Sequence, residues 1–168
     1  VTALHAHLQH KMGVASLHTE MMLGFEKKTP EAHKSMLNAL TGKTNSYTFE
    51  AHLLNKNGSA KGQLVGGNLS VLYSLLGSES QPDTNGKILF IEDLDEYLYH
   101  IDRMVLSLKR CGCFDGLKGL VVGSFIKMHD NEILWGKTAY QIIADITKKY
   151  DFPIVYNFPA GHIHTNNT

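Results

Sequence analysis

Three segments decide the fold: GGNLSVL at residues 66–72, KILFIED at residues 87–93 and YLYHIDRM at residues 97–104. The short apolar run at 87–91 is typical of a buried strand, and the helical spacing of apolar residues over 96–109 predicts a helix after it. Further apolar strands are predicted at 119–125 and 153–156, with a helix around 139–146 between them. This alternation favours an α/β fold with a mostly parallel sheet.

The residues before this core predict a less regular arrangement. A helix is expected over 2–12, a short strand over 14–17, and a second helix from Thr29-Pro30 to Gly42. Alternating apolar residues over 47–53, followed by Asn57-Gly58, predict a hairpin whose return strand reaches about residue 65. Gly66-Gly67 is expected to break that strand, and Asn68 to cap a helix through residue 76.

Composition excludes some partners. The 168 residues carry 16 basic and 16 acidic side chains and show no basic stripe, so neither nucleic acid nor an anionic membrane surface is expected as a partner. No apolar run is long enough to cross a bilayer. Cys111 and Cys113 are too close in sequence for a good disulfide, which favours reduced thiols and a cytoplasmic location. His5, His7 and His10 are expected at solvated helix positions rather than on a metal.

A carboxylate and a histidine follow predicted strands. Glu92 and Asp93 come after the strand at 88–91, and His162 comes after the strand at 153–156. Ligands of α/β sheets bind beyond the carboxyl ends of the strands, and a serine hydrolase needs an imidazole base oriented by a carboxylate. In the alternative interpretation, the two acids cap a helix beginning near Glu96 and His162 is an ordinary loop residue. The residues alone leave both open.

Other candidate residues also have two interpretations. Gly67 could let backbone N–H groups approach a substrate that the Asn68 amide binds, or the two could form a turn and a helix cap. Arg103, on the helix over 96–109, could hold a substrate carboxylate or pair with neighbouring residues. A metal site built from Glu92, His162 and His164 is a further hypothesis.

The ordered motifs resemble those of the LD-carboxypeptidase family of serine peptidases. That family reads G-x-S-D-x-T-A-L, H-G-P-M, G-G-N-L, L-E-D, I-D-R-M-L, G-L-V-x-G-x-F and P-x-G-H-x-x-x-N. The matching residues here are Thr2 to Leu4, His18 and Met21, residues 66–69, 91–93, 101–104 and 119–125, and Pro159 to His162 with Asn166. The match covers nearly the whole chain, with Thr19 and Glu20 standing where the family has Gly and Pro.

The resemblance implies a Ser–Glu–His triad in which Glu92 is the acid, with Glu96 as its substitute, and His162 the base. Asn68 falls in the substrate pocket. The implied reaction releases the terminal D-alanine of muropeptide tetrapeptides, with a muropeptide or small peptide as partner, no metal or other cofactor, a cytoplasmic location and a possible homodimer.

The resemblance also implies how the chain is organised. Val1 follows the position of the family's G-x-S-D turn, so the nucleophilic serine is expected to precede Val1 in the complete protein. Residues 1–45 are then the tail of an N-terminal α/β nucleophile domain, and residues 46–168 a C-terminal β/α domain that is truncated at its end. The alternatives are an amide hydrolase of a peptide–nucleotide antibiotic, as in the family's self-immunity branch, and a non-catalytic muropeptide-binding remnant.

Overall fold

A single parallel sheet organises the computed structural model, which describes residues 1–21 and 23–168. Its order, β1-β2-β3-β4, is also the order of the strands along the chain. The strands are β1 (Leu64–Asn68), β2 (Ile88–Leu94), β3 (Gly119–Ile126) and β4 (Ile154–Val155), and each pairs in parallel with the next. The α/β fold with a parallel sheet that the sequence predicts is therefore confirmed.

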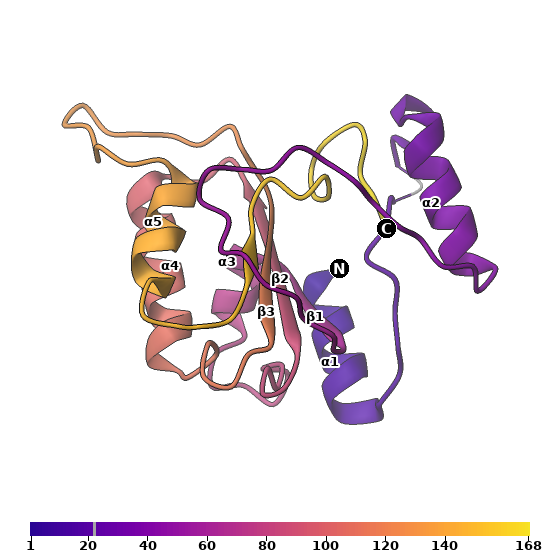
Figure 1. Cartoon of the computed structure of the whole chain (residues 1–168), viewed down its shortest axis with the longest axis horizontal. Coiled ribbons are helices and arrows are strands. Elements are labelled where there is room, and N and C mark those ends of the chain that lie inside the picture. Colours follow the sequence, from indigo (N-terminus) through magenta and orange to yellow (C-terminus); the bar gives the residue numbers. More distant parts are fainter. Residues whose placement is uncertain (22) are drawn as a thin grey trace.

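The helices α3 (Leu69–Ser74), α4 (Leu98–Arg110) and α5 (Ala139–Thr147) each connect two neighbouring strands. Right-handed crossovers between strands that follow one another in order place their helices on the same face of a sheet. Figure 1 shows α4 and α5 side by side on one side of the sheet, with α1 and α2 at the opposite end of the molecule, where α1 contacts β1 and α3.

The hydrophobic core lies between the sheet and the helices α3, α4 and α5. Its strand residues are apolar on both faces, as parallel strands covered on both sides require. The helix α4 contributes a buried stripe at helical spacing, as the sequence predicts. Fully or almost fully buried core residues include Leu89, Ile91, Ile101, Val105, Leu120, Val122, Ile142 and Ile143.

Two helices precede the sheet, α1 (Thr2–Met12) and α2 (Pro30–Leu40). Both agree with the sequence prediction: Gly13 ends α1 in the left-handed conformation, and the Thr29 hydroxyl accepts a hydrogen bond from the Ala32 N–H at the start of α2. A short 3₁₀ helix (Phe25–Lys27) lies between them. The strand predicted over 14–17 is wrong, because these residues are exposed and run without a sheet partner.

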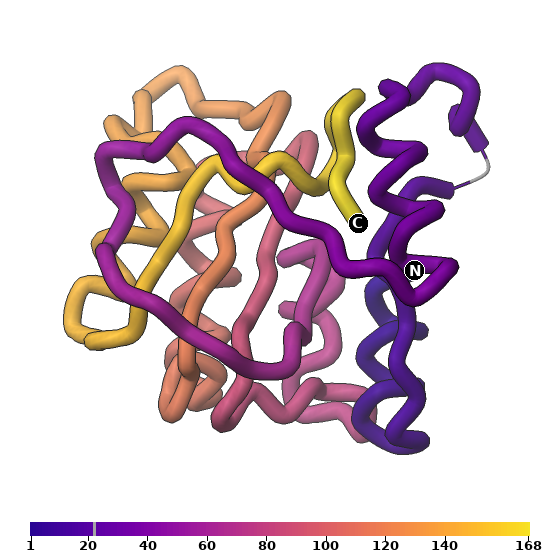
Figure 2. The backbone as a smooth tube through the Cα atoms, turned by 45° about the vertical axis from the view of Figure 1, so that its right-hand side comes forward, coloured from indigo at the N-terminus to yellow at the C-terminus, as the bar shows by residue number. Residues whose placement is uncertain are grey.

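The predicted hairpin over 47–65 is also wrong. The segment 43–63 instead crosses the sheet as an extended chain (Figure 2) and touches β4 through an isolated antiparallel bridge between Lys56 and Ile154. Tyr47 and Phe49 pack on the ring of Phe158, whereas Leu53 is fully exposed. The alternation therefore marks an extended segment correctly, but its pairing partner is not the return segment, since β1 pairs with β2 in the parallel sheet.

Gly66 and Gly67 lie inside β1 rather than ending a strand. Their φ angles of 124° and 143° are ones that L side chains rarely adopt. A Cβ atom on Gly66 would lie 2.0 Å from the Phe90 carbonyl oxygen, and one on Gly67 would lie 2.7 Å from Oγ1 of Thr2. The two glycines thus allow β2 on one side and α1 on the other to approach the β1 backbone closely.

Across residues 1–21 and 23–168, no helix combines the length and the apolar composition needed to cross a bilayer. The two cysteines lie at the end of α4, as expected, with Cys111 exposed and Cys113 buried and neither in a disulfide. Burial raises the pKa of the Cys113 thiol to about 11.

Candidate active site

The carboxyl ends of the strands bring the predicted site residues together. Asn68, the last residue of β1, is in register with Glu92 near the end of β2. Between β2 and β3 the register shifts: Ile91 pairs with Val122 and Asp93 with Phe125, so β3 carries one extra residue opposite Glu92. Such a bulge bends a strand and re-aims the side chains beside it. Glu92 and Asp93 are therefore part of the strand itself.

Glu92 and His162 form a close pair. Nδ1 of His162 lies 2.7 Å from Oε2 of Glu92. The Glu92 side chain is 1% exposed, while that of His162 is 47% exposed. The hydrogen bond to Glu92, outweighing the opposing effect of burial, raises the pKa of His162 above its ordinary value of 6.5. A buried acid thus holds one ring nitrogen, leaving Nε2 for a reacting group, as the base of a hydrolase requires.

A cavity of about 410 Å³ opens beside this pair. The start of α1, residues 18–21, 23 and 28, the ends of β1 and β2, and the loop after β4 line it. Its walls comprise Val1, Thr2, His5, His18, Thr19, Glu20, Met21, Leu23, Lys28, Asn68, Val71, Glu92, Gly161, His162 and Asn166. Glu92, His162 and Asn68 therefore share one cavity.

Asp93 serves a different purpose from its neighbour. Its Oδ2 accepts a hydrogen bond from the Ser70 N–H at 2.9 Å, and its Oδ1 accepts one from Nδ2 of Asn68 at 2.7 Å. Burial raises the pKa of this carboxyl despite these bonds. The hypothesis that Glu92 and Asp93 cap the helix near Glu96 is therefore wrong, because Asp93 binds the start of α3 and Glu92 binds His162.

Asn68 is a helix cap that also lines the cavity. Its Oδ1 accepts hydrogen bonds from the Val71 N–H and the Ser70 hydroxyl at the start of α3. Its Nδ2 gives one hydrogen to Asp93, and because an amide nitrogen carries two hydrogens, the other is left for the cavity. The cap interpretation is confirmed, and substrate binding by Asn68 and by the neighbouring Gly67 backbone stays a prediction.

Arg103 and Glu96 lie elsewhere. Arg103 is exposed on α4 with its guanidinium over the ring of Tyr99, 5.4 Å from the ring centre, and it is not among the residues that line the cavity. Glu96 contacts Nδ1 of His100 at 3.0 Å. The geometry therefore favours Glu92 over Glu96 as the partner of His162 and gives Arg103 no access to this cavity.

Several cavity residues were not singled out from the sequence as site residues. His5, expected to be solvated, contributes to the wall and bonds Oγ of Ser16 through Nδ1 at 2.7 Å. His18 stacks edge-on against Phe90, and burial lowers its pKa, so this imidazole is neutral near pH 7. Glu20 and Lys28 also face the cavity as an ion pair. His18, Glu20 and Lys28 come from an irregular segment, where the sequence carries no periodic signal.

The metal hypothesis finds no cluster in the structure. His164 is exposed, and its Nδ1 lies 3.3 Å from the Lys27 carbonyl oxygen. Over the described ranges, no three His, Cys, Asp or Glu side chains are grouped to hold an ion.

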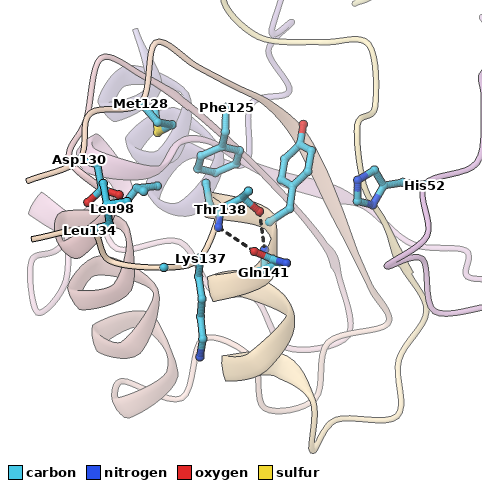
Figure 3. Close-up of a pocket in the computed structure, with 12 residues that line it drawn as sticks. His52, Leu98, Phe125, Met128, Asp130, Leu134, Lys137, Thr138 and Gln141 are labelled. Carbon is cyan, nitrogen blue, oxygen red and sulfur yellow. Dashed lines mark hydrogen bonds between the residues drawn. The ribbon is translucent and has the colours of Figure 1, made fainter.

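A second cavity, of about 630 Å³, lies between the loop after β3 and the start of α5 (Figure 3). Its walls are largely apolar, with Phe125, Met128 and Leu134 among them. Thr138 and Gln141 bond each other's backbone there as a capping box, so their polar atoms are already used in holding the helix start. Among the described residues that line it, no carboxylate is bonded to a histidine, which directs attention to the cavity at His162.

Comparison with known proteins agrees with this fold. The sequence profile of the LD-carboxypeptidase C-terminal domain matches residues 61–168. The probable murein peptide carboxypeptidase of Bacillus subtilis is 33% identical over 167 residues, which is 96% of this chain and 52% of the relative. The microcin C7 self-immunity protein MccF of Escherichia coli is 30% identical over 111 residues, or 64% of this chain and 31% of the relative.

Solved structures give the same result for the fold. The muramoyltetrapeptide carboxypeptidase from Oxalobacter formigenes superimposes with a TM-score of 0.85 at 24% identity, covering 99% of this chain and 57% of that one. MccF in complex with glutamyl sulfamoyl guanosine gives a TM-score of 0.81. The fold thus places the chain in the class of α/β domains with a parallel sheet. The chain belongs to the LD-carboxypeptidase family and spans about half the length of the curated relatives it matches.

Proposed function

We propose that the complete protein is a serine-type LD-carboxypeptidase that releases the terminal D-alanine from muropeptide tetrapeptides. The observation that carries this proposal is the Glu92–His162 pair, in which a fully buried carboxylate orients a half-exposed imidazole at the wall of a cavity. The family supplies the reaction class, because the relatives that match this chain include a probable murein peptide carboxypeptidase.

Each residue has a role in the proposed mechanism. A serine hydroxyl attacks the carbonyl carbon of the L,D-amide while Nε2 of His162 takes its proton, and the imidazolium then gives that proton to the departing D-alanine nitrogen. Glu92 fixes the tautomer and orientation of His162 and stabilises the imidazolium. Water attacks the resulting acyl-enzyme with His162 again as base, which releases the shortened peptide and restores the serine.

The start of α1 supports a position for the serine. Val1 is the N-cap of α1, and both Val1 and Thr2 line the cavity that holds His162. A nucleophilic serine of α/β hydrolases sits on a sharp turn between a strand and a helix. A serine shortly before Val1 would therefore occupy such a turn and face His162. This placement fits the expected G-x-S-D sequence upstream of Thr2.

The test measures D-alanine release from a muropeptide tetrapeptide by the full-length protein and its variants. We expect His162→Ala, and alanine in place of the serine before Val1, to lower kcat by at least about 10³-fold, as loss of a triad member does. His164→Ala is the matched control, because this exposed histidine lies only two residues away and outside the cavity. Full turnover by the His162→Ala variant would refute the mechanism.

Assays of the same full-length protein on other substrates distinguish two alternative functions. Hydrolysis of a peptide–nucleotide antibiotic is suggested by the similarity to MccF, but the described residues lining the cavity include no Phe, Tyr or Trp on which a nucleobase could stack. Cleavage of an aminoacyl sulfamoyl nucleoside without D-alanine release would favour that alternative. Binding of the muropeptide without cleavage of either substrate would favour a non-catalytic role.

A further inference from the structure

A buried serine lies between the candidate acid and the loop that carries the candidate base. Ser124 is 6% exposed and belongs to the bulge that places one extra residue of β3 opposite Glu92. Its N–H donates a hydrogen bond of 2.9 Å to the carbonyl of Ala160, two residues before His162. The backbone of this serine therefore holds the start of the histidine loop.

The side chain of Ser124 has no comparable use in the fold. Among all the described residues, its buried Oγ finds no hydrogen-bond partner. Buried hydroxyls in proteins are nearly always hydrogen-bonded, because burial without a partner costs free energy. An exception of this kind calls for an explanation, and a role in catalysis is one of those known in native structures.

The Glu92 carboxylate lies close to this hydroxyl. The point that a Cβ atom of Gly161 would occupy is 2.4 Å from Oγ of Ser124 and 2.9 Å from Oε2 of Glu92, so the two oxygens are a few ångströms apart. Oε2 is bonded to Nδ1 of His162, and a carboxylate oxygen has a second lone pair for another donor. Ser124 is not among the described residues that line the cavity, so it meets the acid but not a substrate.

We propose that Ser124 is a positioning residue for the Glu92–His162 pair, because its hydroxyl donates a hydrogen bond to the Glu92 carboxylate. Rotation about the Cα–Cβ bond of the serine turns the hydroxyl towards that oxygen. The acid is then held from the side of β3 while the imidazole binds it from the side of the cavity. This inference rests on the proposed function and adds a residue to its mechanism.

A donor on the carboxylate changes how strongly the acid holds the protonated base. A hydrogen bond to Glu92 stabilises its negative charge and weakens the attraction of that charge for the imidazolium of His162. Loss of the hydroxyl should therefore raise the pKa of His162, which is opposite in sign to removing the Glu92 charge itself. Other titratable groups around the pair stay in place in such a variant: Asp93 of β2, His5 of α1, and His18, Glu20 and Lys28 of the segment before α2.

The family motif leaves this position open. In G-L-V-x-G-x-F, Ser124 stands at the second x, between Gly123 and Phe125, which match the motif. The hydroxyl is therefore a property of this chain's own strand. The proposed contact accordingly belongs to this protein and is testable in it.

The experiment compares Ser124→Ala with the wild type, both as the full-length protein. We expect kcat of D-alanine release to fall about 10- to 100-fold, the effect of losing one hydrogen bond to a charged group. The acid limb of the pH profile should move to higher pH. Titration of the His162 ring, followed by NMR, should move in the same direction, and this measurement needs no turnover.

Two further variants separate the inference from a structural role. Ser124→Thr keeps the hydroxyl and should keep the acid limb of the wild type. Thr84→Val removes a buried hydroxyl that bonds the Cys113 carbonyl, at a position outside the cavity, and should leave the His162 titration unchanged. An unshifted His162 titration in Ser124→Ala would overturn the inference, whether or not the rate falls. If the wild type releases no D-alanine, the proposed function fails, and the NMR titration still decides whether Ser124 acts on the pair.

Discussion

A Cβ atom on Gly161 would lie 2.9 Å from Oε2 of Glu92, the same oxygen that binds His162. It would also lie 2.4 Å from Oγ of Ser124, and the φ of Gly161 is 121°. Only a residue without a side chain lets the loop after β4 come this close to the buried carboxylate. The distance between Glu92 and His162 therefore depends on the glycine that precedes the histidine.

Gly161→Ala is expected to reduce kcat of the full-length protein by about 100-fold, the cost of displacing a catalytic group by about 1 Å. Gly77→Ala is the matched control, since Gly77 also has a positive φ of 76° but has open space around it. The two variants are compared by the kinetics of D-alanine release and by their melting temperatures. Unchanged kcat in Gly161→Ala would show that the close approach is not required.

Glu92→Gln is expected to change the pH profile as well as the rate. The hydrogen bond to Glu92 raises the pKa of His162, and the base must be neutral, so wild-type kcat/KM should fall as the pH drops through this raised pKa. Removing the negative charge lowers that pKa and moves the acid limb to lower pH, while kcat falls. Profiles from pH 5 to 9 measure both effects, and an acid limb that stays in place would contradict the assignment.

The same pair has a defined effect on stability. Because the folded-state pKa of His162 lies above 6.5, the stabilisation from its protonation is present at pH values below the unfolded pKa and is lost as the pH rises through the folded pKa. His162→Ala should therefore destabilise the protein more at pH 5 than at pH 8. Urea unfolding at the two pH values tests the sign, and an equal loss at both would contradict it.

Asp93→Ala is expected to lower the free energy of unfolding by about 3 kcal/mol, because it strips buried donors of their acceptor. The Ser70 N–H and Nδ2 of Asn68 both lose their bond to the carboxylate. Asp151→Ala, at an exposed carboxylate in a loop, should change stability by less than about 0.5 kcal/mol. Urea denaturation of the two variants measures the difference. A loss in Asp93→Ala no larger than in the control would show that Asp93 does not stabilise α3.

Gly66→Ala is expected to lower the free energy of unfolding by about 3 kcal/mol or more, because overpacking and a strained φ act together. This loss exceeds that expected of any surface substitution. The added methyl group would meet the backbone of Phe90 in the neighbouring strand. Gly86→Ala is the control for a left-handed backbone without a steric clash, since Gly86 has a φ of 70° and open space around it. Thermal unfolding of both variants decides between the two contributions, and equal melting temperatures would contradict the steric argument.

Periodic segments could be predicted from the sequence, and segments held by contacts distant in sequence could not. The helix α4 and the strand β2 carry their burial in their own pattern of apolar residues, so the sequence predicts both. Residues 47–53 carry an extended pattern too, but their segment is placed by Phe158, which contacts Phe49, and by Ile154, which bridges Lys56, about a hundred residues later. The Gly66-Gly67 pair predicts a strand break, because the sequence does not show that β2 and α1 come close to these two glycines.

The residues of the site also fall into those that the sequence predicts and those that it does not. Glu92 and His162 could be predicted to lie near each other, because each follows or ends a strand and parallel strands end at one edge of the sheet. The strand pattern alone could not separate Asp93 from Glu92, and the hydrogen bonds show that Asp93 binds the start of α3 whereas Glu92 binds His162. Lys28 carries no sequence signal and Glu20 only a departure from the family motif, since the irregular segment that carries them is placed only by its contacts with Ile163 and the cavity wall.

The loop that carries His162 is anchored at both ends to different parts of the molecule. At its start, the Ser124 N–H of β3 donates to the Ala160 carbonyl, and at Thr168 the chain is tied to Ser35 of α2 and to the hydroxyl of Tyr47. Glu92, by contrast, is fixed within the sheet. The acid is therefore held by the sheet alone and the base by both the sheet and α2, so a shift of α2 against the sheet would pull on the histidine loop and not on Glu92, altering the alignment of the pair without disturbing the core.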